Sequence, residues 1–112
     1  MENRSKANEK LACDICRYLT DNMESRITIK MLSEKFHISG TSIKCAFKSA
    51  YGESIYAYIR KQKMLSAAEE LKSTDKSVLE IAGIYGYDNG SKFAKAFREC
   101  MGMSPFNYRK NG

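Results

Sequence analysis

Few residues of this chain could carry covalent or metal chemistry. Cys13 and Cys16 have the spacing of half a zinc site or of a redox pair, and Cys45 and Cys100 stand alone. No second close pair completes a ligand set, and His37 is the only histidine. The sequence also lacks an evident acid-base pair and a glycine loop that would cradle phosphate. We therefore expect reduced, partly buried cysteines, no cofactor and no enzymatic activity.

Cationic and hydroxyl side chains are better candidates for a function. The net charge of the 112 residues is +6, and the whole excess lies after residue 34, because residues 1–34 carry six basic and six acidic side chains and residues 35–112 carry thirteen and seven. No acid occurs between Gly40 and Lys48 or between Asn89 and Arg98. Acids would repel phosphate, so these two segments favour a polyanionic partner. A merely soluble surface is also compatible with the charge alone.

The two acid-free segments belong to two copies of one sequence unit. The stretch 86–109 reappears when it is shifted back by fifty positions. The identical pairs are Gly40/Gly90, Ala46/Ala96, Phe47/Phe97, Gly52/Gly102, Ser54/Ser104 and Tyr58/Tyr108. A copy of about fifty residues would be marginally stable alone, so we expect one compact domain or two small lobes that share a core.

Apolar spacing and capping residues predict an all-α protein with seven helices and no strand. The helices are expected at about 7–22, 29–36, 40–51, 53–72, 78–85, 89–101 and from 105 onward, with N-caps at Thr28, Ser39, Ser77, Asn89 and Ser104. Each copy therefore contains a helix, a tight turn and a second capped helix, which is the helix-turn-helix plan. We expect one such lobe at 7–53, a linker helix and connection at 54–75, and a second lobe at 76–110.

The second helix of a helix-turn-helix lies in the major groove of DNA and directs its N-terminal outward residues at the bases. Ile43 and Phe47 in the first copy, and Phe93 and Phe97 in the second, mark the buried sides of these helices. The outward positions are Gly40, Thr41, Lys44, Cys45 and Lys48, and then Gly90, Ser91, Ala94, Lys95 and Arg98. Solvated helix faces are the alternative interpretation of the same pattern.

The chain resembles the DNA-binding domain of the AraC/XylS family of bacterial transcription regulators over about Leu11 to Lys110. The most specific matches are Ile81-Ala82, Gly86-Tyr87, Phe93, Phe97, Gly102, Ser104-Pro105 and Tyr108-Arg109. Tyr87 departs from the phenylalanine that is usual in the family. The resemblance implies seven helices, two helix-turn-helix lobes, a rigid linker helix, and two reading helices in successive major grooves on one face of DNA.

The outward faces and the resemblance together predict the residues that contact DNA. Base reading is expected from Gly40, Thr41, Lys44, Cys45, Gly90, Ser91, Ala94 and Lys95, and phosphate contact from Ser42, Lys48, Arg60, Lys61, Lys92 and Arg98. Lys44 and Lys95 would make most hydrogen bonds to bases, whereas Cys45 and Ala94 are limited to apolar contact such as a thymine methyl. Tyr108 and Arg109 are expected to hold the last helix in place.

We expect a cytoplasmic, sequence-specific regulator of transcription that binds double-stranded DNA and recruits or positions RNA polymerase, acting as an activator by analogy with the family. The alternative is a basic protein-interaction module without sequence-specific DNA binding. The sequence contains no apolar run of about eighteen residues and no secretory leader, so no membrane is expected as a partner. The chain is expected either to bind as a monomer or to be the C-terminal part of a regulator that dimerises through an effector domain.

Overall fold

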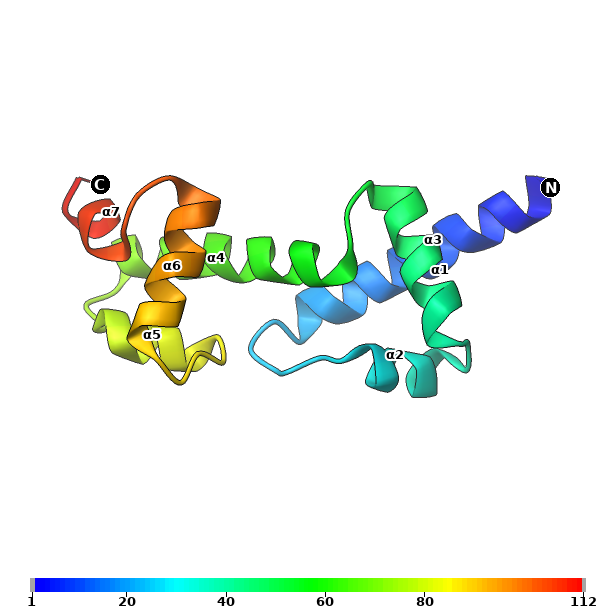
Figure 1. Cartoon of the computed structure of the whole chain (residues 1–112), viewed down its shortest axis with the longest axis horizontal. Helices are drawn as coiled ribbons and strands as arrows, with labels where there is room; N and C mark the ends of the chain where they lie inside the picture. Colours follow the sequence, from blue (N-terminus) through cyan, green and yellow to red (C-terminus); the bar gives the residue numbers. More distant parts are fainter. Residues whose placement is uncertain (1, 112) are drawn as a thin grey trace. The chain divides into compact units, whose positions relative to one another are not determined.

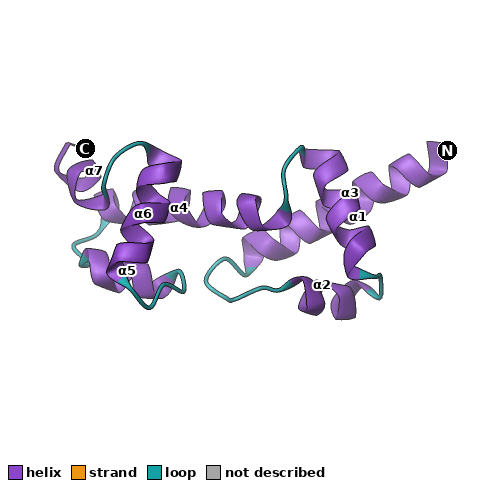
Figure 2. Ribbon diagram, viewed as in Figure 1, coloured by secondary structure: helices purple, strands orange, loops and turns teal. Residues whose placement is uncertain are grey.

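The computed structural model describes the backbone of residues 2–111 and the side chains of residues 8–111. This part of the chain contains seven helices and no strand, as the sequence predicts (Figure 1, Figure 2). They are α1 (Glu2–Asp21), α2 (Ile29–Phe36), α3 (Gly40–Tyr51), α4 (Ile55–Ser73), α5 (Val78–Ile84), α6 (Gly90–Met101) and α7 (Pro105–Asn111). Within the same residues, no helix has both the length and the apolar character needed to cross a bilayer.

The chain divides into two compact units. The first comprises α1 with the following residue Asn22 and the segment Arg26–Ile59, and the second comprises Met23–Ser25 and the chain from Arg60 onward. Helix α4 therefore contributes residues to both units. The division lies inside the segment 54–75, which the sequence assigns to a linker helix and its connection.

Side-chain caps begin the helices at the predicted positions. The Oγ1 atom of Thr28 accepts the Met31 amide at 3.1 Å, and the Oγ atom of Ser39 accepts the Ser42 amide at 3.2 Å. Asn89 accepts two amides at the start of α6, those of Ser91 at 2.7 Å and Lys92 at 3.3 Å. These bonds satisfy amides that have no partner within the first turn of a helix, and they fix where α2, α3 and α6 begin.

Two helix starts differ from the prediction. Helix α1 begins at Glu2 and not near Ala7, because the apolar spacing marks only the part of a helix that faces a core. Helix α4 begins at Ile55 and not at Glu53. Ser54 is its N-cap, since its Oγ atom accepts the Ala57 amide at 3.1 Å.

The core of the first unit lies between α1, α2, α3 and the start of α4. It contains Ile15, Leu19, Ile27, Leu32, Ile43, Phe47 and Ile55. Ile43 and Phe47 are fully buried, as predicted, whereas Ile29 and Phe36 at the ends of α2 are only partly covered. The Phe47 ring also meets the Tyr58 ring edge to face at a centroid distance of 5.2 Å. The buried side of α3 is thus fixed against its neighbours.

The core of the second unit repeats this arrangement with α4, α5 and α6. It contains Met64, Ala67, Ala68, Leu71, Ile81, Ala82, Tyr85, Phe93, Ala96 and Phe97. Phe93 and Phe97 are fully buried, as predicted. Ala46 and Ala96, which are equivalent in the repeat, are both buried in this way, so each copy uses the same face of its second helix for packing.

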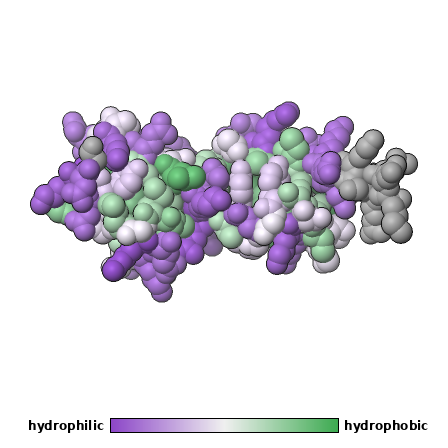
Figure 3. All heavy atoms as spheres, turned by 90° about the horizontal axis from the view of Figure 1, so that it is seen from above, coloured by the Kyte–Doolittle hydropathy of each residue, from purple (hydrophilic) through white to green (hydrophobic). Residues whose placement is uncertain are grey.

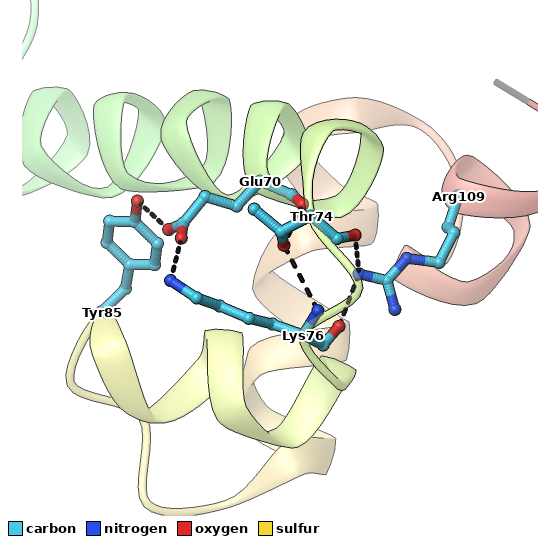
Figure 4. A network of polar contacts seen from close by, with 5 residues as sticks. All are labelled: Glu70, Thr74, Lys76, Tyr85 and Arg109. Atoms are coloured by element: carbon cyan, nitrogen blue, oxygen red, sulfur yellow. Dashed lines mark hydrogen bonds and ion pairs between the residues drawn. The ribbon is translucent and has the colours of Figure 1, made fainter.

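A polar network closes the second unit where α4 ends (Figure 4). The Arg109 side chain of α7 donates to the carbonyl oxygens of Leu71 at 2.8 Å, Thr74 at 3.3 Å and Lys76 at 2.5 Å. The carbonyls at the end of a helix have no intrahelical partner, and a guanidinium can satisfy several of them in one plane. Arg109 therefore ties α7 to the end of α4 and to the segment before α5.

Candidate nucleic-acid interface

Helix α3 presents the predicted contact residues of the first unit to solvent. Thr41, Ser42, Lys44, Cys45 and Lys48 are all exposed, and we call these five residues the α3 face. They occupy the side of the helix opposite the buried residues of the core. The Ser42 hydroxyl lies 3.0 Å from that of Ser39, which donates to it at the N-cap. The α3 face thus carries two lysines and three small polar side chains and has no acid.

Helix α6 presents the equivalent surface of the second unit. Ser91, Lys92, Lys95 and Arg98 are exposed and Ala94 is half-buried, and these five residues form the α6 face. Three of the five side chains are cationic. A shallow depression on this surface is lined by Ala94, Lys95, Arg98, Glu99 and Ser104. The two faces therefore present the same chemistry, small or hydroxyl side chains interleaved with cations.

The glycines that begin the two helices lie in different surroundings. A Cβ atom on Gly40 would lie 2.9 Å from the Cγ2 atom of Ile29 in α2, whereas a Cβ atom on Gly90 would lie 3.7 Å from the Cδ1 atom of Leu79 in α5. In both glycines, the side from which a side chain would project therefore faces the preceding helix of the same unit. Only their backbone atoms are available for a contact with DNA, and Gly40 is also required for the close approach of α2 and α3.

An ion pair that the sequence analysis missed lies beside the α6 face. The guanidinium of Arg60 in α4 donates to the Glu99 carboxylate in α6, and the two side chains are 40% and 48% exposed. This hydrogen bond lowers the pKa of Glu99 and raises that of Arg60. The predicted phosphate contact Arg60 is therefore engaged by an acid in the structure. Lys61, its neighbour on α4, is exposed.

The cysteines lie apart from these faces, with the exception of Cys45. The expectation of partly buried cysteines is wrong for three of the four: Cys13, Cys45 and Cys100 are exposed. Only Cys16 is half-buried, with its Sγ atom 3.0 Å from the Tyr58 hydroxyl. Among the residues that the structure describes, no three histidine, cysteine or acidic side chains come together as metal ligands would. The Cys16 to Tyr58 contact joins α1 to α4 within the first unit.

Both hydrophilic residues, drawn purple, and hydrophobic residues, drawn green, are visible on the surface of each unit (Figure 3). Leu79 and Phe106 are the most exposed large apolar side chains of the described chain, at 66% and 67%. They stand singly on α5 and α7. Scattered apolar residues of this kind are normal for a protein surface and need no ligand to explain them.

Comparisons with known proteins agree with this geometry. A family model described as a helix-turn-helix domain matches residues 32–111. Among curated relatives, the chain is 37% identical over 97 residues to the HTH-type transcriptional regulator YdiP of Escherichia coli, which covers 87% of the chain and 32% of YdiP. It is 30% identical over 95 residues to the multiple antibiotic resistance protein MarA of Salmonella typhimurium, covering 85% of the chain and 75% of MarA. It is 28% identical to the HTH-type transcriptional activator AarP of Providencia stuartii, covering 86% and 71%.

The chain thus spans about a third of YdiP but most of MarA and AarP. Among solved structures, the C-terminal domain of the response regulator AraT from Geobacillus stearothermophilus matches with a TM-score of 0.85 and 30% identity, covering 91% of this chain and 85% of that one. The DNA-binding domain of AdpA, solved with a target DNA, shares the fold with a TM-score of 0.83 at 23% identity, covering 89% and 90%. The chain belongs to the AraC/XylS family of helix-turn-helix transcription regulators.

Proposed function

We propose that this protein is a sequence-specific, double-stranded DNA-binding transcription regulator that inserts α3 and α6 into successive major grooves. One observation carries this proposal. Each unit exposes, on the second helix of a helix-turn-helix, an acid-free face of cationic and small polar side chains whose opposite side is fully buried. Such a face combines groove access, hydrogen-bond donors and attraction to phosphate.

Base reading rests mainly on one lysine in the first half of each of these helices. Lys44 and Lys95 are exposed and donate to acceptors such as the O6 and N7 atoms of guanine. The hydroxyls of Thr41 and Ser91 are suited to either bases or phosphate. Cys45 and Ala94 bring small apolar surfaces suited to a thymine methyl group. Gly40 and Gly90 contribute through their backbone.

Phosphate contacts set the position of each helix and supply most of the affinity. The candidates are Ser42, Lys48, Arg60, Lys61, Lys92 and Arg98, of which Arg60 is engaged by Glu99. Phosphate contacts are independent of sequence and release counterions, so binding is expected to weaken steeply as salt increases.

The regulatory outcome is activation, with RNA polymerase as the partner at the promoter. The name of AarP, a transcriptional activator of comparable extent, supports this outcome. A protein that acts on chromosomal DNA in a bacterium works in the cytoplasm. Both faces are preformed on helices with packed cores.

Three lysine-to-alanine variants test the assigned roles. Preferred sites are first selected from a random duplex pool, and affinity is then measured on the preferred site, on single-base variants and on random duplex. Lys44→Ala and Lys95→Ala should each lose about 1–3 kcal/mol and relax the preference at one base position. Lys92→Ala, the control on α6, should weaken binding to all duplexes alike and reduce the slope of log K against log salt by about 1.

Equal losses on preferred and random duplex for all three variants would reject the assignment of base readers. Affinity that does not change with salt would reject phosphate contact, and with it DNA as the partner. If the chain instead binds an acidic protein that random duplex cannot displace, the basic interaction module is the correct alternative.

A further inference from the structure

The Arg60–Glu99 ion pair places a negative charge at the edge of a surface that is otherwise cationic. Glu99 is the only acid in α6, and its carboxylate accepts from Arg60 of α4. Lys95 lies one turn earlier on the same helix, and its charge also lowers the pKa of Glu99, after the larger effect of the Arg60 hydrogen bond. The carboxylate is thus ionised at neutral pH, and it lies close to one predicted base reader and one predicted phosphate contact.

The repeat shows that helix packing does not require this acid. The position fifty residues earlier is Ser49, which is exposed near the end of α3. The first unit therefore buries the same face of its second helix with a small neutral residue at the equivalent place. Glu99 is itself exposed and contributes nothing to the buried core of the second unit. Its distinctive contact is the ion pair with Arg60.

We propose that Glu99 limits sequence-independent DNA binding by keeping Arg60 from phosphate. This inference rests on the proposed function and names a residue that tunes it. An arginine paired with a carboxylate is already charge-balanced and does not neutralise a phosphate, so the counterion condensed on that phosphate is not released when DNA binds. The carboxylate would also repel a phosphate that approached the α6 face. Non-specific binding comes almost entirely from phosphate contacts, and it is the binding that Glu99 reduces.

Glu99→Gln removes the charge and keeps the size of the side chain. Affinity for a random duplex of about 20 base pairs, long enough for two successive grooves, is measured between about 50 and 200 mM salt. One additional phosphate contact should steepen the slope of log K against log salt by about 0.9. Over this fourfold change in salt, the loss of affinity should become about 3.5-fold greater than in the unaltered chain.

Glu69→Gln is the matched control. Glu69 is an exposed acid on α4 of the same unit, and its replacement causes the same change in net charge. Arg60→Gln completes the design. In the Arg60→Gln background, Glu99→Gln should no longer steepen the slope, because the guanidinium that it would release is absent. Thermal melting checks that each variant folds, and Glu99→Ser, which copies the first unit, is the second variant if glutamine disturbs the helix.

Each outcome decides the proposal. A steeper slope for Glu99→Gln alone, cancelled by Arg60→Gln, supports it. Equal effects of Glu99→Gln and Glu69→Gln would show that only net charge matters and would overturn the proposal. A shallower slope for Glu99→Gln would show that Glu99 orients Arg60 toward phosphate, and it would overturn the proposal as well. Salt-dependent binding with an unchanged slope overturns this inference alone. Absence of salt-dependent binding by the unaltered chain overturns the proposed function as well.

Discussion

Replacement of Gly40 and Gly90 by alanine should have opposite effects on stability, although the two glycines are equivalent in the repeat. Each is the first residue of its helix. A Cβ atom at position 40 would lie 2.9 Å from the Cγ2 atom of Ile29, and one at position 90 would lie 3.7 Å from the Cδ1 atom of Leu79. Carbon atoms attract best at about 3.5–4.0 Å, so the first contact is a clash and the second is favourable.

The magnitudes follow from the atoms that would have to move. Cγ2 is attached directly to the branched Cβ atom of Ile29, whose χ1 angle is restricted, so it cannot swing away as the end of a long side chain would. Overpacking of this kind costs about 1–3 kcal/mol. Alanine regains at most about 1 kcal/mol over glycine in helix propensity, and less at a first position. We expect Gly40→Ala to destabilise by about 0.5–2 kcal/mol and Gly90→Ala to stabilise by up to about 1 kcal/mol.

Urea unfolding followed by far-ultraviolet circular dichroism measures both changes, with each unit fitted separately if two transitions appear. The double variant Ile29→Ala with Gly40→Ala tests the cause, because removing the Cγ2 atom should abolish most of the cost of the alanine at position 40. The reasoning fails if both glycine variants shift stability in the same direction by the same amount, or if the double variant shows no coupling.

Three further predictions concern the helix ends and the titrating groups. Gly102 has φ of 84°, so Gly102→Ala should cost about 1–2 kcal/mol, whereas Gly83→Ala, in open space within α5, should gain up to about 1 kcal/mol in the same unfolding measurement. Hydrogen bonds from Tyr85 and Lys76 lower the pKa of the Glu70 carboxyl from 4.5. The stability that the ionised carboxylate contributes is therefore complete above that value and is lost as the pH falls through the lowered pKa. Between about pH 5 and pH 3, the free energy of unfolding should fall less in Glu70→Gln than in the unaltered chain. A hydrogen bond with Cys16 raises the pKa of the Tyr58 hydroxyl from 10.0 to about 12, and burial makes a smaller contribution in the same direction. The free energy of unfolding should therefore fall as the pH rises through this range, and it should fall less in Tyr58→Phe.

Local signals in the sequence predict most of the fold. Caps such as Thr28 and Asn89 act on amides two or three residues away, and a left-handed glycine such as Gly102 ends the helix that directly precedes it. Core positions such as Phe93 and Phe97 are one helical turn apart. All these features depend on residues within a few positions of one another, so the seven helices and their buried sides follow from the sequence. Apolar spacing predicts the start of α4 too early, because this spacing does not reveal that Ser54 is the cap.

The candidate faces were predictable for the same reason. Once a core residue such as Phe47 defines the buried side of a helix, the opposite side is determined by the 3.6-residue period. The exposure of Lys44 and Lys95 is therefore a consequence of local pattern. The roles of these lysines in reading bases stay predictions, which the lysine variants will decide.

The sequence by itself determined which segments are helical, which side of each helix is buried, and that two copies of one cationic unit are present. Only the tertiary structure decided which residues meet across long separations. Arg60 contacts Glu99 from 39 positions away, and Arg109 reaches the Leu71 carbonyl from 38. It also distinguished Gly40 from Gly90, which occupy equivalent positions in the repeat but have different clearances to the preceding helix. Such distances depend on how the helices pack against one another in the assembled core, and the spacing of residues along one helix does not determine that packing.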